Sequence, residues 1–129
     1  MTSTEKVKQA ITHFVEGGDL SDLEILNKVL HPDFCVASYG FMGTSGVTLI
    51  DKHQYLANIR DGIFGGLPRK MTIESMDVSE TIAMVKLYLE SSENDFVSYN
   101  SLVLDIDMEW KLIHNLAVVK SKKDLSNLI

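Results

Sequence analysis

The chain has 129 residues, of which 45% are hydrophobic and 23% charged, and 12 basic against 18 acidic side chains give a net charge of −6. This length fits one domain, so we expect residues 1–129 to form a single domain with its own apolar core. The single cysteine, Cys35, excludes an intrachain disulfide, and the acidic charge argues against nucleic-acid binding. Because no apolar run approaches the roughly 20 residues of a membrane span, and residues 1–6 lack the apolar region of a signal peptide, we expect a cytoplasmic protein with no membrane partner.

Apolar periodicity predicts three helices. The first spans residues 4–16, with a capping box at Thr2 and Glu5 and a stop at Gly17-Gly18. Its buried stripe consists of Val7, Ala10, Ile11, Phe14 and Val15.

The second predicted helix spans residues 21–29, with Ser21 and Glu24 at the positions of a capping box. The third begins after Asp51, whose side chain suits an N-cap, with Gln54 as the capping partner, and it ends before the glycine-rich residues 62–68. Tyr55 belongs to the apolar face of this third helix.

Strands dominate the rest of the chain. Residues 34–39 have the character of a strand, and residues 40–48 suit an irregular edge strand or a loop. After Lys70 we expect an antiparallel sheet, followed over residues 120–129 by a short helix or a frayed end. Helices followed by a long meander predict an α+β fold with the helices on one face of the sheet. The expected strands of the antiparallel part are residues 71–78, 82–91, 95–106 and 109–119.

Segments at residues 14–34, 50–56, 73–83 and 96–113 together resemble the NTF2-like superfamily, closest to its "putative lumazine-binding" and SnoaL-like groups. The resemblance covers most of residues 10–116. It implies a cone, in which a curved, mostly antiparallel sheet wraps three N-terminal helices and leaves a pocket inside. It does not imply one activity, since this fold hosts isomerases, dehydratases, cyclases and transport factors.

Three residues depart from the pattern of that family. Met108 stands in the last turn where the family usually has glycine, Ser98 stands where it has an acidic residue, and Asn115 stands where a lysine is common. These departures weaken the transfer of any site from the family to this chain.

The last hairpin decides which side chains face the pocket, and two registers are open. A two-residue turn would pair Leu104 with Lys111, whereas a three-residue loop would pair Leu104 with Trp110 and Leu102 with Leu112. The second register gathers the apolar side chains on one face, although it requires a left-handed conformation at Met108. It places Leu116 inward, and it turns Tyr99, Val103, Ile113, Ala117 and Val119 outward.

The three-residue loop also brings Asn100 opposite His114 on the face that we expect to line the pocket. His114 could act as an acid, a base or a hydrogen-bond donor near neutral pH, or it could be a structural histidine paired with Asn100. Tyr55, Phe14 and Trp110 complete the predicted ligand-binding set. The other histidines show no metal-ligand spacing, and Cys35 is expected to be a buried small hydrophobe.

We therefore expect a protein that binds a small, apolar or cyclic ligand, with no cofactor and no metal. An isomerase-, dehydratase- or cyclase-like activity is possible on this fold, but no carboxylate can be placed inside the pocket from the sequence. The alternative is a non-catalytic, dimeric interaction module whose cavity is filled by its own side chains. In either case the apolar outer face of the sheet predicts a homodimer.

Overall fold

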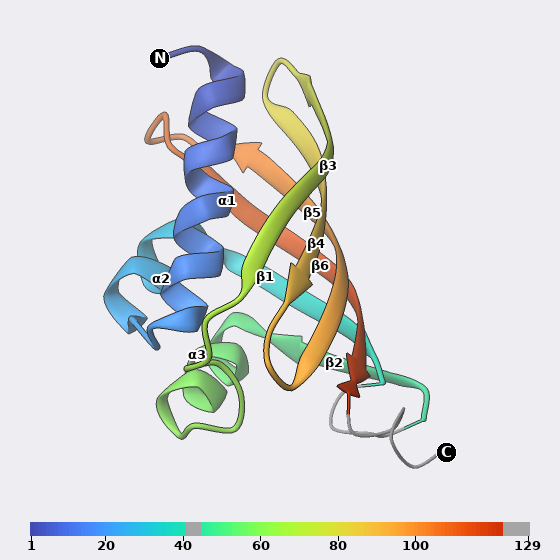
Figure 1. The fold of residues 1–129 in the computed structure, drawn as a ribbon. Helices are drawn as coiled ribbons and strands as arrows, with labels where there is room; N and C mark the ends of the chain where they lie inside the picture. Colours follow the sequence, from blue (N-terminus) through green and yellow to red (C-terminus); the bar gives the residue numbers. More distant parts are fainter. Residues whose placement is uncertain (41–44, 123–129) are drawn as a thin grey trace.

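A computed structural model describes residues 1–40 and 45–122, in which one six-stranded sheet carries three helices (Figure 1). The part of the predicted tail after residue 122 lies outside the described residues. The elements, in chain order, are α1 (Ser3–Asp19), α2 (Leu23–Val29), β1 (Leu30–Tyr39), β2 (Val47–Asp51), α3 (Lys52–Arg60), β3 (Lys70–Ser79), β4 (Ile82–Glu90), β5 (Asn94–Leu104) and β6 (Trp110–Ser121).

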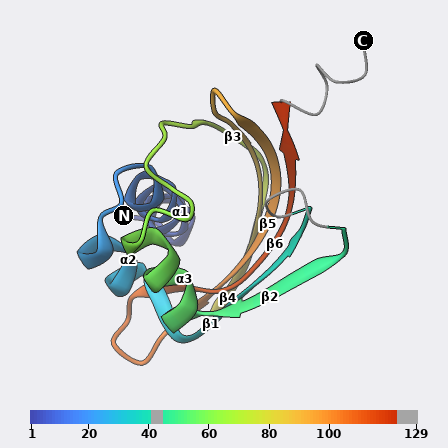
Figure 2. The ribbon, with the colours of Figure 1, turned by 90° about the horizontal axis from the view of Figure 1, so that it is seen from below.

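The sheet is open and mixed, with the strand order β2-β1-β6-β5-β4-β3. The β1–β6 pair is parallel and the other pairs are antiparallel, which agrees with the predicted α+β, mostly antiparallel architecture. Figure 2 shows the sheet curving round the helices, which all lie on its concave side. The core fills the space between these two layers, with Val7 and Ile11 of α1, Leu26 of α2 and Leu87 of β4 at its centre.

Two of the predicted helix starts are confirmed. The Thr2 hydroxyl accepts a hydrogen bond from the Glu5 amide at 3.1 Å, and Asp51 Oδ1 accepts one from the Gln54 amide at 2.8 Å. The predicted start of α2 is wrong, because Asp22 caps this helix through its 3.1 Å bond from the Ile25 amide. Ser21 instead adopts a left-handed conformation, with φ of 51°.

The predicted stop at Gly17-Gly18 is also wrong, since α1 continues to Asp19. Both glycines are buried, and a Cβ added to Gly17 would lie 2.9 Å from the Leu26 side chain. The missing side chain therefore lets α1 and α2 approach closely. In this helix the glycines serve packing and not termination.

The register of the β5–β6 hairpin matches the three-residue loop. Leu104 pairs with Trp110 and Leu102 pairs with Leu112. The Asp105 amide donates to the Glu109 carbonyl at 2.9 Å across the loop, and Met108 has φ of 65°, the left-handed conformation that the loop requires.

A β-bulge follows this turn. Ser101 pairs with His114 although Leu102 pairs with Leu112, so Ile113 is an extra residue on β6. One extra residue sends every later side chain of the strand to the opposite face. Asn115, Ala117 and Val119 consequently point to the concave side.

The prediction that His114 faces the interior opposite Asn100 is wrong for this reason. Asn100 pairs with Asn115, and His114 lies on the outer face, paired with Ser101. The predicted orientations of Leu116, Ala117 and Val119 are reversed in the same way. Leu116 is 49% exposed, whereas Ala117 and Val119 line the concave surface.

Cys35 also departs from the prediction. The alternation of β1 turns Val36 and Ser38 to the concave side, so the Cys35 thiol is exposed on the outer face. None of the described helices is long and apolar enough to cross a membrane.

Candidate functional site

A cavity of about 680 Å³ lies between the concave face of the sheet and the ends of α1 and α3. Its two sides differ in chemistry. The helical side is apolar and aromatic, and the sheet side carries hydroxyl and amide groups. The side chains that define the contrast are Phe14, Tyr55, Ile59 and Phe64 on the helical side, and Ser38, Thr48, Ser98 and Asn115 on the sheet side.

The aromatic wall is built around Tyr55 of α3. Its ring stacks on Phe14, with centroids 6.0 Å apart, and contacts Phe64 at 5.2 Å. An edge contact with Phe34 at 5.6 Å joins this wall to the core. Burial raises the pKa of the Tyr55 hydroxyl to about 12, so it is a neutral phenol at physiological pH.

Three polar side chains on the sheet form one hydrogen-bonded network, which we call the polar floor: Ser98, Asn100 and Asn115. Asn115 Nδ2 donates to Asn100 Oδ1 at 2.7 Å and to the Ser98 hydroxyl oxygen at 2.9 Å. Asn100 Nδ2 donates to the Val85 carbonyl at 3.4 Å and to the same Ser98 oxygen at 3.1 Å. Ser98 and Asn115 reach the cavity, and Asn100 supports them from behind.

An ion pair closes one side of the cavity. Arg69 Nε lies 2.6 Å from Asp19 Oδ1, and the two side chains are only 16% and 14% exposed. Arg69 also donates to the Val15 carbonyl at 3.1 Å and lies over the Phe96 ring, 5.4 Å from its centroid. The positive charge that Arg69 brings to the cavity wall is therefore compensated by Asp19.

The predicted ligand-binding residues divide into two groups. Phe14 and Tyr55 line the cavity, and their role in binding stays a prediction. Asn100 is the fully buried member of the polar floor and does not line the cavity, Trp110 belongs to the core cluster, and His114 lies on the outer face. The structure therefore does not bring the five residues together.

Sequence reasoning missed the polar residues that do reach the cavity, above all Ser98 and Asn115. A signal for both was present, since each departs from the pattern of the family that the chain resembles. The position of Ser98 follows from the same alternation along β5 that turns Asn100 inward. The position of Asn115 could not be recognised, because the bulge at Ile113 of β6 leaves no mark in the alternation of the sequence.

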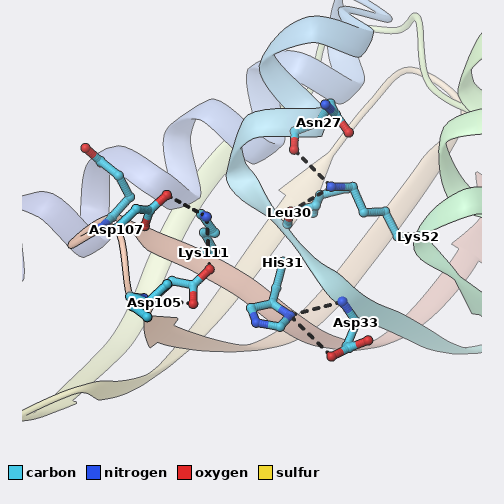
Figure 3. A network of polar contacts seen from close by, with 10 residues as sticks. Asn27, Leu30, His31, Asp33, Lys52, Asp105, Asp107 and Lys111 are labelled. Carbon is cyan, nitrogen blue, oxygen red and sulfur yellow. Dashed lines mark hydrogen bonds and ion pairs between the residues drawn. The ribbon is translucent and has the colours of Figure 1, made fainter.

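A second polar cluster lies near the β5–β6 turn (Figure 3). Lys111 Nζ bridges Asp105 at 2.9 Å and Asp107 at 2.8 Å, and its hydrogen bonds lower the pKa of both carboxyl groups. Lys52 Nζ donates to the Asn27 and Leu30 carbonyls at the end of α2, at 3.0 and 2.9 Å. Burial, and then the charge of Lys111, lower the pKa of Lys52. The Lys111 contacts tie the turn to β6, and the Lys52 contacts join α3 to the end of α2.

His31 belongs to the same region, and its Nδ1 accepts a hydrogen bond from the Asp33 amide at 3.0 Å (Figure 3). This contact is local turn chemistry. Within residues 1–40 and 45–122, no three His, Cys, Asp or Glu side chains are grouped to hold a metal ion.

Comparison with known proteins identifies the fold. The family described as "Putative lumazine-binding" matches residues 2–116. An NTF2-like protein from Cytophaga hutchinsonii ATCC 33406 is similar in structure, with a TM-score of 0.79 and 16% identity over 93% of this chain and 100% of that one. No curated protein matches the sequence.

Two further structures illustrate the range of these neighbours. An NTF2-like protein of unknown function from Shewanella baltica OS155 gives a TM-score of 0.76 at 16% identity, over 93% of this chain and 98% of that one. A protein described as "putative ketosteroid isomerase" from Parabacteroides distasonis ATCC 8503 gives a TM-score of 0.66 at 16% identity, over 88% of this chain and 87% of that one. Identities this low establish a shared fold only.

Proposed function

This chain belongs to the family described as "Putative lumazine-binding", within the NTF2-like superfamily, and on that premise we propose that it binds a small, neutral, planar or cyclic molecule. The observation that carries the proposal is the cavity of about 680 Å³, with an aromatic wall opposite a polar floor. Small-molecule sites commonly have volumes of about 300–1,000 Å³ and combine apolar walls with a few placed polar groups.

The charges around the cavity support a neutral ligand. Arg69 is already paired with Asp19 at 2.6 Å, so an anionic ligand would compete with a buried carboxylate. Among the described residues that line the cavity, Glu93 is the one carboxylate, and it is exposed. A charged ligand would lose its hydration in this cavity without gaining a free counter-charge.

The ion pair between Arg69 and Asp19 also favours a binding function over proton abstraction, because Asp19 is held by Arg69 and is not available as a base. The volume of the cavity argues against the alternative of an interaction module whose interior is filled by its own side chains. A catalytic role of the isomerase, dehydratase or cyclase type stays a less supported form of the proposal.

The substitution Ala117→Phe tests the proposal. Ala117 is a small side chain of β6 on the cavity surface, so a phenyl ring there would occupy the cavity. The matched control is Leu116→Phe, one residue away on the opposite face. We expect naphthalene, followed by NMR chemical-shift titration, to bind the wild type and Leu116→Phe equally, and to bind Ala117→Phe at least about tenfold more weakly.

Mass spectrometry of small molecules that co-purify with the wild type and with Ala117→Phe gives a second readout. We expect neutral cyclic compounds with the wild type and their loss with the variant. The proposal fails if Ala117→Phe binds naphthalene as tightly as the wild type, or if the wild type binds no neutral planar probe and co-purifies with no compound.

We also propose that two copies of the chain associate through the outer face of the sheet. Large apolar side chains are exposed there, among them Leu49, Tyr99 and Leu116. The register brings them together, since Leu116 pairs with Tyr99, and the small, buried Ala37 between them pairs with both Leu49 and Leu116. Exposed apolar patches of this kind commonly mark interfaces. The cytoplasmic location, like the dimer, stays a prediction.

A further inference from the structure

We infer that the polar floor selects ligands that present a hydrogen-bond acceptor and an adjacent N–H donor, as a lactam or another cyclic amide does. In this assignment Ser98 donates its hydroxyl proton to the acceptor and Asn115 Oδ1 accepts the ligand N–H. Asn100 is a positioning residue that fixes the direction of both contacts. The inference rests on the proposed function, because it assigns the chemistry of the same cavity.

The direction of the network follows from a single backbone group. The Val85 carbonyl can only accept, so the end of the Asn100 amide that lies 3.4 Å from it must be Nδ2. Asn100 Oδ1 then faces Asn115 at 2.7 Å, which obliges Asn115 to present Nδ2 there. The reverse orientation of either amide would place two oxygens in contact.

Counting protons and lone pairs then leaves two groups free. Both amide protons of Asn115 are used, by Asn100 and by Ser98 at 2.9 Å, so its Oδ1 has spare accepting capacity. The Ser98 oxygen accepts from Asn115 and from Asn100, so both of its lone pairs are used and its proton is left to donate. In the described part of the chain, no acceptor of that proton is found.

These two free groups belong to the cavity. Ser98 and Asn115 both contribute to its surface although their residues are buried. No enclosed side-chain oxygen or nitrogen of the described residues lacks a partner, so the spare side of Asn115 Oδ1 must open on to the cavity. A donor and an acceptor attached to one network thus face the same ligand.

Complementarity explains why a cyclic amide fits better than a simple ketone or hydrocarbon. A carbonyl accepts from Ser98, and the N–H beside it donates to Asn115. The planar ring meets the aromatic wall formed by Tyr55 and Phe14. A ligand that lacks the N–H would leave Asn115 Oδ1 dehydrated and unpaired, which costs more than the mean worth of one hydrogen bond.

Three planar bicyclic probes separate these contributions. Carbostyril carries both groups of the lactam, N-methylcarbostyril keeps the carbonyl but lacks the N–H, and naphthalene has neither. We expect the wild type to bind carbostyril about tenfold more tightly than N-methylcarbostyril, measured by NMR titration or calorimetry.

Two variants assign the roles. Asn115→Ala should abolish the difference between carbostyril and N-methylcarbostyril. Ser98→Ala should weaken both compounds by the same several-fold factor, keep the difference between them and leave naphthalene unchanged. Ser101→Ala, on the outer face of the same strand as Ser98 and outside the network, should keep the wild-type pattern and serves as the matched control. Circular dichroism establishes that each variant is folded, and Ser98→Ala keeps the test available if Asn115→Ala does not fold.

Each outcome separates this inference from the proposed function. If the wild type binds carbostyril and N-methylcarbostyril equally, if Asn115→Ala keeps the difference, or if Ser98→Ala alters naphthalene as much as carbostyril, the assignment is wrong. The proposed function then still stands, provided that naphthalene binding is lost in Ala117→Phe. If none of the three probes binds and nothing co-purifies with the wild type, both proposals fail.

Discussion

At the scale of single residues, the protein places two asparagine side chains in the interior surface of its sheet. Asn100 is fully buried and Asn115 nearly so, and the amide protons of both are donated to the network or, for one proton of Asn100, to the Val85 carbonyl. Burying an amide costs free energy unless its hydrogen bonds are replaced. Here every donor of the pair is matched, and the spare acceptor reaches the cavity.

Asn100→Ala should therefore lower the free energy of unfolding by about 1–3 kcal/mol, because it leaves Asn115 Nδ2 without its 2.7 Å acceptor and the Val85 carbonyl without its side-chain donor. Urea denaturation measures this value. The control is Asn58→Ala, which removes an exposed 2.7 Å bond with Gln54 and should change stability by less than about 0.5 kcal/mol. Equal effects of the two changes would contradict the importance of the buried network.

The buried Tyr55 hydroxyl makes the free energy of unfolding depend on pH in the alkaline range. Its pKa is raised from 10.0 to about 12 by burial, so the folded state favours the neutral phenol. A group with a raised pKa contributes stability that is present below its unfolded pKa and is lost as the pH rises through the folded pKa. The stability from this group should therefore decline between about pH 10 and pH 12, by about 2–3 kcal/mol in total.

Tyr55→Phe should remove that part of the alkaline loss and the late step in the ultraviolet titration of tyrosinate. Tyr88→Phe, on the outer face, should keep both and provides the control. A titration of the wild type that shows no tyrosinate step above about pH 11 would show that Tyr55 is not buried as described.

Prediction of the cavity-lining residues from the sequence succeeded on the helices and failed on the sheet, for physical reasons. Phe14 and Tyr55 were placed correctly on the cavity wall, because helical periodicity is regular over α1 and α3. His114 was misplaced because Ile113 is an extra residue in β6, and strict alternation cannot account for a bulge. The polar side chain that reaches the cavity is consequently its neighbour Asn115.

At the scale of elements, the turn between β5 and β6 stores strain that one substitution can relieve. Met108 is left-handed, with φ of 65°, and is 68% exposed. Left-handed backbone costs an L-residue about 1–2 kcal/mol, and glycine avoids that cost at some expense in unfolded-state entropy.

Met108→Gly should raise the free energy of unfolding by about 0.5–1 kcal/mol, measured by thermal and urea denaturation. Ile106→Gly is the matched control, since Ile106 lies in the same loop, is 96% exposed and does not have a positive φ. That change should lower stability. A loss of stability in Met108→Gly would mean that the Met108 side chain contributes more than its backbone strain costs.

The elements differ in how far the sequence alone determines them. Thr2 and Asp51 were identified as caps because a capping bond is local and spans three residues. The extension of α1 through Gly17 could not be foreseen, since it depends on contact with Leu26 of another helix. The parallel pairing of β1 with β6 is likewise a tertiary feature that joins distant parts of the chain.

At the scale of the whole molecule, one curved sheet offers two surfaces with different tasks. The concave surface meets the helices, as Figure 2 shows. It also bounds the cavity, whereas the convex surface carries exposed apolar side chains. Strand β6 contributes to both, with Ala117 inside and its neighbours Leu116 and Val118 outside. The bulge at Ile113 sets this division, so the same local irregularity determines what the cavity and the outer face each present.

The outer face supports a prediction about assembly. At micromolar concentration, light scattering should give a mass of twice the 14.4 kDa of one chain. Leu116→Glu should reduce the mass to that of one chain, because a carboxylate at the centre of the patch would be dehydrated against an apolar partner surface.

Ile106→Glu adds the same charge at an exposed turn and should leave the dimer intact. Circular dichroism of Leu116→Glu must match that of the wild type, since the substituted side chain points away from the core. A wild-type mass of one chain, or a dimer that persists in folded Leu116→Glu, would place any association elsewhere on the surface.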